Sequence, residues 1–143
     1  METDLFSIRD RVAIVTGASS GLGRRFAEVL AQRGATVVAA ARRLHRLDEL
    51  ADQYPTIVPV QADLLESADR ARVVATAIER FGRIGVLVNN AGAGTAGRAL
   101  DEPVERFRRV IELNLTSVFE LSQLTARNMI DNGGGSIINI ASV

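Results

Sequence analysis

The sequence predicts an α/β fold in which helices cover both faces of one parallel sheet. Short runs of apolar residues alternate with stretches in which apolar residues recur at helical spacing, and a glycine-rich turn joins the first run to the first helical stretch. Strands that are apolar throughout are typical of parallel sheets buried on both faces. A chain of 143 residues, 47% of them hydrophobic, is sufficient for one domain with one core.

The N-terminal part of the chain contains a complete strand–helix–strand unit. Residues 12–15 (VAIV) form the first apolar run, and residues 36–40 (TVVAA) form a second run rich in β-branched residues. Gly34 is expected to end the helix between them, because helices commonly end with a glycine in the left-handed conformation. Leu22, Phe26, Val29 and Leu30 recur at helical spacing, which predicts that helix.

Three further strands are predicted over residues 57–60, 84–88 and 137–140. Pro59 has no N–H to donate, so it places the first of these at an edge of the sheet. The helix before residue 84 is predicted to end at Gly82 and to bury Ala71, Val74, Ile78 and Phe81. A long helix over about residues 104–130, ended by three glycines, is marked by Phe107, Val110, Ile111, Leu115, Val118 and Leu121.

Composition and charge exclude several functional classes. The formal net charge is zero and the 17 basic residues are spread along the chain, so nucleic acid is not an expected partner. No apolar run approaches the ~18 residues of a membrane span, and residues 1–10 lack the apolar core of a signal peptide, so a soluble, cytoplasmic protein is expected. Cysteine and lysine are absent, which excludes disulfides, thiolate ligands and Schiff-base chemistry, and no metal site is expected.

The turn over residues 16–23 (TGASSGLG) is the strongest chemical signal in the chain. It lies between the first strand and the first helix. Glycines at this position permit a tight turn and let backbone N–H groups and the helix N-terminus approach a pyrophosphate. Such glycines can also serve geometry alone, but their place inside a strand–helix–strand unit favours a dinucleotide site.

In four motifs the sequence resembles the classical short-chain dehydrogenase/reductase family. The loop motif TGxxxGxG is matched at Thr16, Gly17, Gly21 and Gly23. Residues 89–92 (NNAG), 114–117 (NLTS) and 136–142 (SIINIAS) match, in order, the segment ending the fourth strand, the segment with the catalytic asparagine and the strand with the catalytic serine. The resemblance implies a Rossmann-type doubly wound parallel sheet with strand order 3-2-1-4-5. It also implies a single NAD(P)-binding domain over residues 1–143, truncated after the fifth strand.

The resemblance assigns roles to two catalytic positions. Ser142 would hydrogen-bond the substrate carbonyl or hydroxyl, although an isolated serine can simply close a strand. Asn114 would hold a water in the proton relay. Its alternative is a solvated helix residue, but it lies within the apolar residues 111–115, where a polar side chain needs a partner.

The same resemblance implies a set of residues that bind the dinucleotide. The residues expected at the pyrophosphate are Gly17, Ser19, Ser20, Gly21, Leu22 and Gly23. Those expected at the nicotinamide-side ribose are Asn90, Ala91 and Gly92, whereas Asn89 is expected to brace the sheet. Asp63, followed by Leu64, would accept a hydrogen bond from the adenine amino group. Asp63 fits equally well as the N-cap of a helix starting near Leu65, and the two roles are compatible.

The end of the second strand bears on the choice between NADP and NAD. NAD-preferring members carry an acidic residue where this chain has Ala41, followed by Arg42. Arg42 can pair bidentately with a 2′-phosphate, so NADP is favoured over NAD. Ser20 departs from the basic residue that many NADP-binding members carry at that position. The alternative, a solvated basic start of a helix, explains Arg43 better than Arg42, and the only histidine, His45, is expected at the surface nearby.

The acid/base pair of the family, a tyrosine and a lysine in a YxxxK motif, has no counterpart here. The only tyrosine, Tyr54, precedes a proline in a predicted loop. We therefore expect Val143 to be a truncation and residues 1–143 alone to be inactive. The intact protein would transfer a hydride between NADP(H) and a small carbonyl or alcohol substrate, as a homo-oligomer (dimer or tetramer). The alternatives are a non-catalytic dinucleotide-binding module and a partner-dependent structural fragment.

Overall fold

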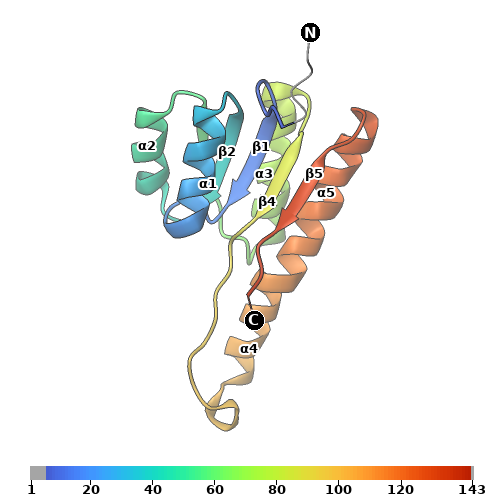
Figure 1. Cartoon of the computed structure of the whole chain (residues 1–143). Coiled ribbons are helices and arrows are strands. Elements are labelled where there is room, and N and C mark those ends of the chain that lie inside the picture. The colour runs from blue at the N-terminus through green and yellow to red at the C-terminus, as the bar shows by residue number, and fades with distance from the viewer. Residues whose placement is uncertain (1–5, 143) are drawn as a thin grey trace.

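The computed structural model of the chain describes residues 6–142. Residues 1–5 and Val143 lie outside the described residues. Residues 1–5 belong to the segment expected to lack a signal peptide, and Val143 is the position at which a truncation is expected. One parallel sheet has the strand order β3-β2-β1-β4-β5, which confirms the predicted topology (Figure 1). The strands are β1 (Val12–Thr16), β2 (Thr36–Ala41), β3 (Ile57–Gln61), β4 (Val86–Asn89) and β5 (Ser136–Asn139).

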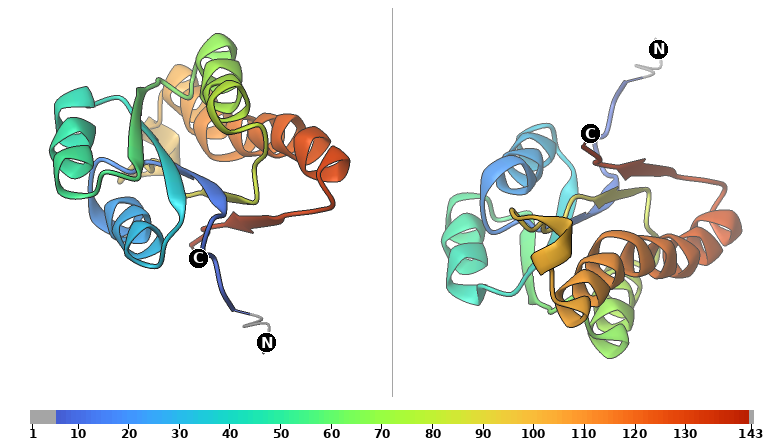
Figure 2. Two further views of the ribbon diagram at one scale, coloured as in Figure 1. Left: turned by 90° about the horizontal axis from the view of Figure 1, so that it is seen from above. Right: turned by 90° about the horizontal axis from the view of Figure 1, so that it is seen from below.

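Helices cover the sheet in two layers, as the two views of Figure 2 show. One layer contains α1 (Gly21–Gln32) and α2 (Leu44–Gln53), and the other contains α3 (Ser67–Phe81) and α5 (Ser117–Asp131). A helix α4 (Val104–Ile111) runs into α5 through the π-helical segment η2 (Glu112–Thr116), and the 3₁₀ turn η1 (Ala99–Asp101) precedes α4. In Figure 1, α4 and the segment before it extend beyond the carboxyl ends of the strands.

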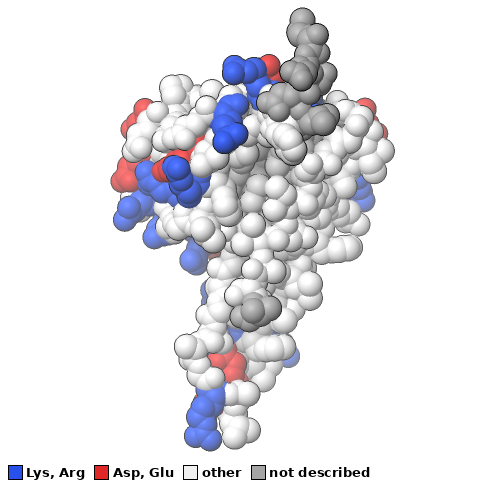
Figure 3. Space-filling model, viewed as in Figure 1, with Lys and Arg blue, Asp and Glu red and all other residues white. Residues whose placement is uncertain are grey.

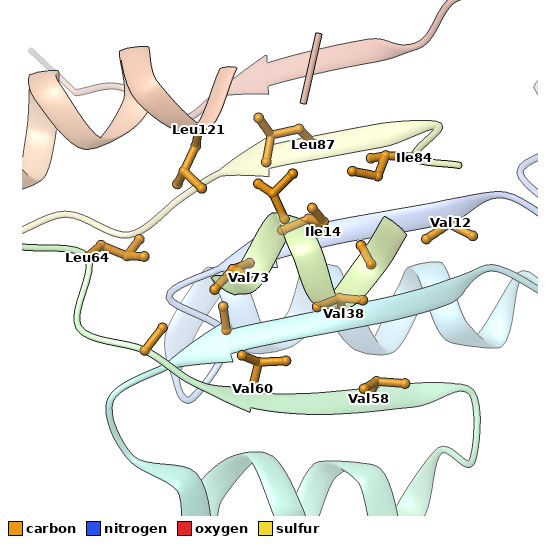
Figure 4. Packing of buried hydrophobic residues seen from close by; sticks show 14 of the residues in the cluster. Val12, Ile14, Val38, Val58, Val60, Leu64, Val73, Ile84, Leu87 and Leu121 are labelled. Atoms are coloured by element: carbon orange, nitrogen blue, oxygen red, sulfur yellow. The ribbon is translucent and has the colours of Figure 1, made fainter. Parts of the chain in front are cut away.

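Two apolar clusters, one on each face of the sheet, make up the core. In the cluster of Figure 4, Ile14 and Val38 of the central strands pack with Val73 of α3 and Leu121 of α5. The cluster on the opposite face includes Ala13, Val15, Val37, Ala39, Leu47 and Leu50. Alternate residues of β1 and β2 thus enter opposite clusters, because successive side chains of a strand point to opposite faces.

The residues that interrupt regular structure act as predicted. Gly34 follows α1 with a φ of +90° and Gly82 follows α3 with a φ of +77°, a backbone region that glycine adopts at little cost. Pro59 lies on β3, which is an edge strand, opposite Ala39 of β2. His45 is exposed on α2, as expected.

One residue predicted in a buried helical stripe, Ala71 of α3, is exposed instead. Leu22, which is at helical spacing in α1, is 62% exposed. The buried residues of α1 are Gly23 and Ala27, so this helix packs on the sheet through its smallest side chains. The prediction for Ala71 was wrong because the buried face of α3, which contains Arg70, Val73, Val74 and Ala77, is rotated from the predicted stripe.

The start of α3 also differs from the prediction. The helix begins at Ser67, with Glu66 at the N-cap position, rather than near Leu65. Asp63 is therefore not the N-cap, and its Oδ1 instead accepts a hydrogen bond from the N–H of Leu65 at 3.0 Å, in a turn before the helix. Aspartate side chains readily stabilise such turns, which compete locally with helix.

The predicted long helix exists, but it is not uniform. The π-helical segment divides it, and Phe107 and Leu115 are exposed although they belong to its apolar stripe. All four residues of β5 are exposed as well, and none of them belongs to either apolar cluster, whereas the other edge strand, β3, is largely buried. Among the described residues, no helix is both long and apolar enough to cross a membrane.

Candidate functional site

A cavity of about 670 Å³ opens at the carboxyl end of the sheet. Its lining includes a residue one or two positions after each of β1 to β4, namely Gly17, Arg42, Asp63 and Asn90. From β1 the chain proceeds to β2 on one side, and it later returns to β4 on the other side, so the cavity lies at the switch point of the sheet. In open α/β sheets this crevice is where ligands bind.

The floor of the cavity is fixed by hydrogen bonds between the ends of β1 and β4. The buried Thr16 hydroxyl accepts hydrogen bonds from the N–H groups of Asn90 and Ala91, both at 3.0 Å. The Asn90 side-chain amide donates to the Thr16 carbonyl at 3.1 Å and to the Gly17 carbonyl at 3.5 Å. The side chain of Asn90 therefore positions the glycine-rich loop.

Two glycines of the loop are required by close packing. Gly17 has a φ of +65°, and a Cβ on it would lie 2.9 Å from Asn90 Nδ2 and 3.0 Å from Ala91 Cα. A Cβ on Gly23 would overlap both the Gly17 carbonyl oxygen and Asn90 Nδ2. Gly21 differs, because its φ is +56° but its Cβ would meet nothing within 4 Å. Close packing against neighbouring atoms therefore requires glycine at positions 17 and 23, whereas at Gly21 only the positive φ favours it.

Arg43 is bound to this loop, although the sequence pattern fitted a solvated position better. Its Nη2 donates hydrogen bonds to Ser20 Oγ at 2.8 Å and to Ser19 Oγ at 3.0 Å. The guanidinium thereby adds a full positive charge beside the N-terminus of α1, whose first turn contains no acidic residue. A helix N-terminus already carries a partial positive charge, so the loop is suited to an anion such as a pyrophosphate.

Most of the predicted dinucleotide-binding residues line the cavity. Those that do are Gly17, Ser19, Ser20, Arg42, Asp63, Leu64, Asn90, Ala91 and Gly92. Gly21, Leu22 and Gly23 are not in the lining, and Gly23 acts by packing behind the loop. The side chain of Arg42 has no hydrogen-bond or ion-pair partner among residues 6–142, and its carbonyl accepts a hydrogen bond from Gln61 at 3.0 Å.

The wall around Asp63 is a hydrogen-bonded turn. The Asp63 N–H donates to Asp69 Oδ2 at 2.7 Å. That hydrogen bond, and then the guanidinium of Arg72, hold the pKa of the Asp69 carboxyl below its usual range. The turn is therefore fixed from both ends, which presents Asp63 and Leu64 to the cavity.

The helical arm formed by α4 and η2 adds cavity residues that could not be identified from the sequence. They are Arg106, Arg109, Val110 and Leu113. Their spacing predicted only a helix, with Val110 in its apolar stripe. Whether that helix reaches the carboxyl ends of the strands depends on how the chain crosses over after β4, which local periodicity does not encode.

Asn114 lies on the π-helical segment and is paired with a backbone amide. Its Oδ1 accepts a hydrogen bond from the Ala93 N–H at 3.0 Å, and its Nδ2 donates to the Ala93 carbonyl at 2.7 Å. A partner was expected, although the residue is exposed rather than buried. π-Helical turns are frequent at functional sites. Neither Asn114 nor Ser142, which is exposed after β5, belongs to the cavity lining, whereas Ala93 does.

Asn89 and Tyr54 lie outside the cavity lining. The Asn89 amide donates to Asn139 Oδ1 at 2.9 Å and to Ser122 Oγ at 3.1 Å, so it braces β4 against β5 and α5, as expected. Tyr54 lies just before β3, at the amino ends of the strands, and its hydroxyl accepts a hydrogen bond from Gln32 at 2.9 Å. The cavity is at the opposite end of the sheet, so Tyr54 cannot act there.

Comparison with known proteins agrees with this geometry. A family model described as short chain dehydrogenase matches residues 11–143. An NAD-dependent glycerol dehydrogenase of Listeria innocua is 37% identical over 138 residues, which are 96% of this chain and 54% of that protein. The structure of a 7α-hydroxysteroid dehydrogenase with NADH and 7-oxo glycochenodeoxycholic acid has a TM-score of 0.89 at 35% identity, over 94% of this chain and 54% of that one.

The structure of a 3-ketoacyl-(acyl-carrier-protein) reductase from Brucella melitensis with NADH has a TM-score of 0.91 at 32% identity, over 95% of this chain and 58% of that one. The chain thus spans a little over half the length of these relatives.

Proposed function

Because this chain belongs to the short chain dehydrogenase family, we propose that it is the N-terminal portion of an NADP-dependent oxidoreductase that interconverts a hydroxyl and a carbonyl group on a small molecule. One observation carries the proposal. A single cavity at the switch point of the sheet is bordered by the glycine-rich loop, by Arg43 and by Asp63. A dinucleotide needs this combination of an anion site and flanking nucleoside sites.

The residues present fit such a cofactor. Gly17 and Gly23 keep side chains out of the loop, and the N-terminus of α1 together with Arg43 would hold the pyrophosphate. Asp63 and Leu64 would contact the adenine. The cavity volume lies in the range of about 300–1,000 Å³ that is typical of ligand pockets. The nicotinamide ring, when bound, supplies or accepts the hydride.

Two residues of the chain would act on the substrate side. Ser142 would donate a hydrogen bond to the substrate oxygen, and Asn114 would hold a water of the proton relay from its position against Ala93. The group that exchanges the substrate proton would lie beyond residue 143. Positioned acid–base groups contribute about 10²–10⁴-fold to rates, so we expect residues 1–143 alone to have no measurable dehydrogenase activity.

The preference for NADP rests on the charge of the cavity. Its lining contains one acidic residue, Asp63, against four arginines. Ala41 occupies the end of β2, so no carboxylate there would repel a 2′-phosphate. The side chain of Arg42, which has no partner among residues 6–142, is next to it. Three relatives are described with NAD or NADH, so the choice between the two cofactors needs a direct test.

The test is titration of NADP⁺ and NAD⁺ into the full reading frame and into Arg42→Ala. The loss of a charge-assisted hydrogen bond costs roughly ten- to a hundred-fold in affinity. We therefore expect the affinity of Arg42→Ala for NADP⁺ to fall by that factor and its affinity for NAD⁺ to be unchanged. Arg46→Ala is the control, because Arg46 is exposed on α2 and does not line the cavity. Equal weakening of both cofactors would assign Arg42 a structural role, and binding of neither cofactor by the unchanged protein would refute the proposed function.

The intact protein is also proposed to be a homo-oligomer. The exposed apolar side chains along α4, η2 and α5 support this part of the proposal: Val104, Phe107, Ile111, Leu115, Phe119 and Ile130. The surface over β4 and β5 shows few charged side chains, whereas arginines gather around α1 and α2 (Figure 3). Apolar surface of this extent commonly marks a contact with another chain segment or subunit.

A further inference from the structure

Arg70 is the only charged residue among the buried residues that the structure describes, with 4% of its surface exposed. It lies on α3, on the face that packs against η2 and α5. A buried charge is unfavourable unless it is paired and hydrogen-bonded. The partners of Arg70 therefore explain why it is tolerated.

Those partners come from three separate segments. Arg70 Nη1 donates to the carbonyl of Leu64 at 2.7 Å and to Glu112 Oε1 at 2.9 Å. Arg70 Nε donates to Glu120 Oε2, and Ser67 Oγ donates to the other oxygen of Glu120 at 2.6 Å. One guanidinium thus joins the loop after β3, the first residue of η2 and the first turn of α5.

Each of two partners leads to a different part of the functional site. Leu64 lines the cavity on the side assigned above to the adenine. Glu112 begins η2, and Asn114, two residues later, holds both backbone groups of Ala93, another cavity residue. Hydrogen bonds of Arg70 to Leu64 and Glu112, followed by the backbone of η2, therefore connect the adenine side to the asparagine of the proposed proton relay.

Stability alone is a weak explanation for this arrangement. Buried ion pairs are often no more stabilising than apolar residues of similar volume. An arginine fork differs from an apolar side chain in fixing several partners at defined angles, and lysine cannot replace it because its ammonium is a single point of charge. The geometry suits a residue whose task is to hold segments in register.

We propose that Arg70 is a positioning residue that couples occupancy of the adenine side of the cavity to the placement of Asn114 on the π-helical segment. The proposal rests on the proposed function, because it assumes that an adenine nucleotide binds against Leu64. Arg70 itself touches neither cofactor nor substrate. Its effect passes through the Leu64 carbonyl on one side and through Glu112 on the other.

The test uses NMR of the full reading frame with adenosine 2′,5′-bisphosphate, which contains the adenosine half of NADP and no nicotinamide. The signal to follow is the side-chain amide resonance of Asn114. Glu112→Ala removes one link, while Arg70 keeps Leu64 and Glu120 as partners. Glu105→Ala is the matched control, because Glu105 is an exposed glutamate of α4 that pairs only with its neighbour Arg108 among the described residues.

We expect the nucleotide to shift the Asn114 resonance in the unchanged protein and in Glu105→Ala. In Glu112→Ala the shift should fall to about half or less, while the affinity for the nucleotide stays within about threefold. Arg70→Lys should behave like Glu112→Ala, and it decides the question if Glu112→Ala fails to fold. If both variants fail to fold, Arg70 has a structural role and the proposal is wrong.

Other outcomes also contradict the proposal. A full Asn114 shift in folded Glu112→Ala would show that Arg70 transmits nothing, and an equal loss in Glu105→Ala would show that the effect is not specific. Loss of nucleotide binding in Glu112→Ala would make the cluster part of the binding wall instead. No binding by the unchanged protein would overturn the proposed function itself, which is a different failure from binding without coupling.

Discussion

Two regions of the molecule differ in how completely they are packed: the side of the sheet with β1 and β2, and the side with β5 and the arm of α4 and η2. β1 is buried along its whole length, and β2 is buried from its second residue on, between α1 and α2 on one face and α3 on the other. β5 is exposed at all four residues, and the arm formed by α4 and η2 contains no buried residue. The glycine-rich loop, Arg43 and Asp63 belong to the packed side, whereas Arg106, Arg109, Val110 and Leu113 of the arm line the cavity from the other side.

This difference separates two tasks of the proposed enzyme. The residues that would bind the dinucleotide are fixed by hydrogen bonds within the described chain, as Thr16, Asn90 and Arg43 show. The residues that would act on the substrate, Asn114 and Ser142, lie on the exposed side. Binding of the cofactor and turnover of the substrate should therefore respond differently to changes in the chain.

The largest expected effect is on the free energy of unfolding, and it should differ between two residues that are paired across β4 and β5. Leu87 is 0% exposed and Ile137, its register partner, is 38% exposed. In residues 1–143, Leu87→Ala should lower the free energy of unfolding by about 2–5 kcal/mol, and Ile137→Ala by about 1 kcal/mol or less. Urea unfolding measures both.

The same two variants should behave differently in the full reading frame. If further chain covers β5, Ile137→Ala should there become nearly as costly as Leu87→Ala, because burial of the side chain would then be complete. Equal costs of the two variants already in residues 1–143 would contradict the contrast between the two sides of the sheet.

The next effect concerns the packing behind the loop. Gly23→Ala should lower the affinity for NADPH by about ten- to a hundred-fold, because the added Cβ overlaps the Gly17 carbonyl and displaces the groups that would hold the pyrophosphate. Gly97→Ala is the control, since a Cβ there meets nothing within 4 Å. Calorimetric titration measures the affinities, and unchanged binding by Gly23→Ala would remove the loop from the proposed site.

The smallest effect is a dependence of stability on pH. The Ser67 hydroxyl, and then the Arg70 guanidinium, hold the pKa of Glu120 below its usual value of 4.5 against the opposing effect of burial. Because the folded pKa is the lower one, this stabilisation is present above pH ~4.5 and is lost as the pH falls through the folded pKa. Its size should be about 1 kcal/mol or less.

The check is the free energy of unfolding between about pH 3 and pH 6. Glu120→Gln should flatten that dependence, whereas Glu79→Gln, on the exposed face of α3, should leave it as it is. A steeper fall at low pH in Glu120→Gln than in the unchanged protein would reverse the sign of this argument.

Features set by single residues could be predicted from the sequence. The glycines after α1 and α3 and the proline on β3 limit the backbone locally, so Gly34, Gly82 and Pro59 identified helix ends and an edge strand correctly. The glycine-rich loop was identified in the same way, because its spacing between a strand and a helix is itself the signal.

Features set by tertiary packing could not be predicted. Nothing local distinguishes Arg43, bound to the loop, from Arg42 beside it, and nothing local marks Arg70 as buried. The π-helical turn at Glu112–Thr116 lies in a sequence that suits an ordinary helix, and its partners Arg70 and Ala93 come from distant segments. The helical arm at the cavity depends equally on the crossover after β4.

We expect the nucleotide site to be complete within residues 6–142, and titration of NADPH is the test. Residues 1–143 and the full reading frame should be titrated side by side, after circular dichroism has shown that both are folded. The two dissociation constants should lie within about tenfold of each other, because the loop, Arg43 and Asp63 are all held by contacts inside this chain. Tight binding by the full reading frame and none by folded residues 1–143 would contradict it.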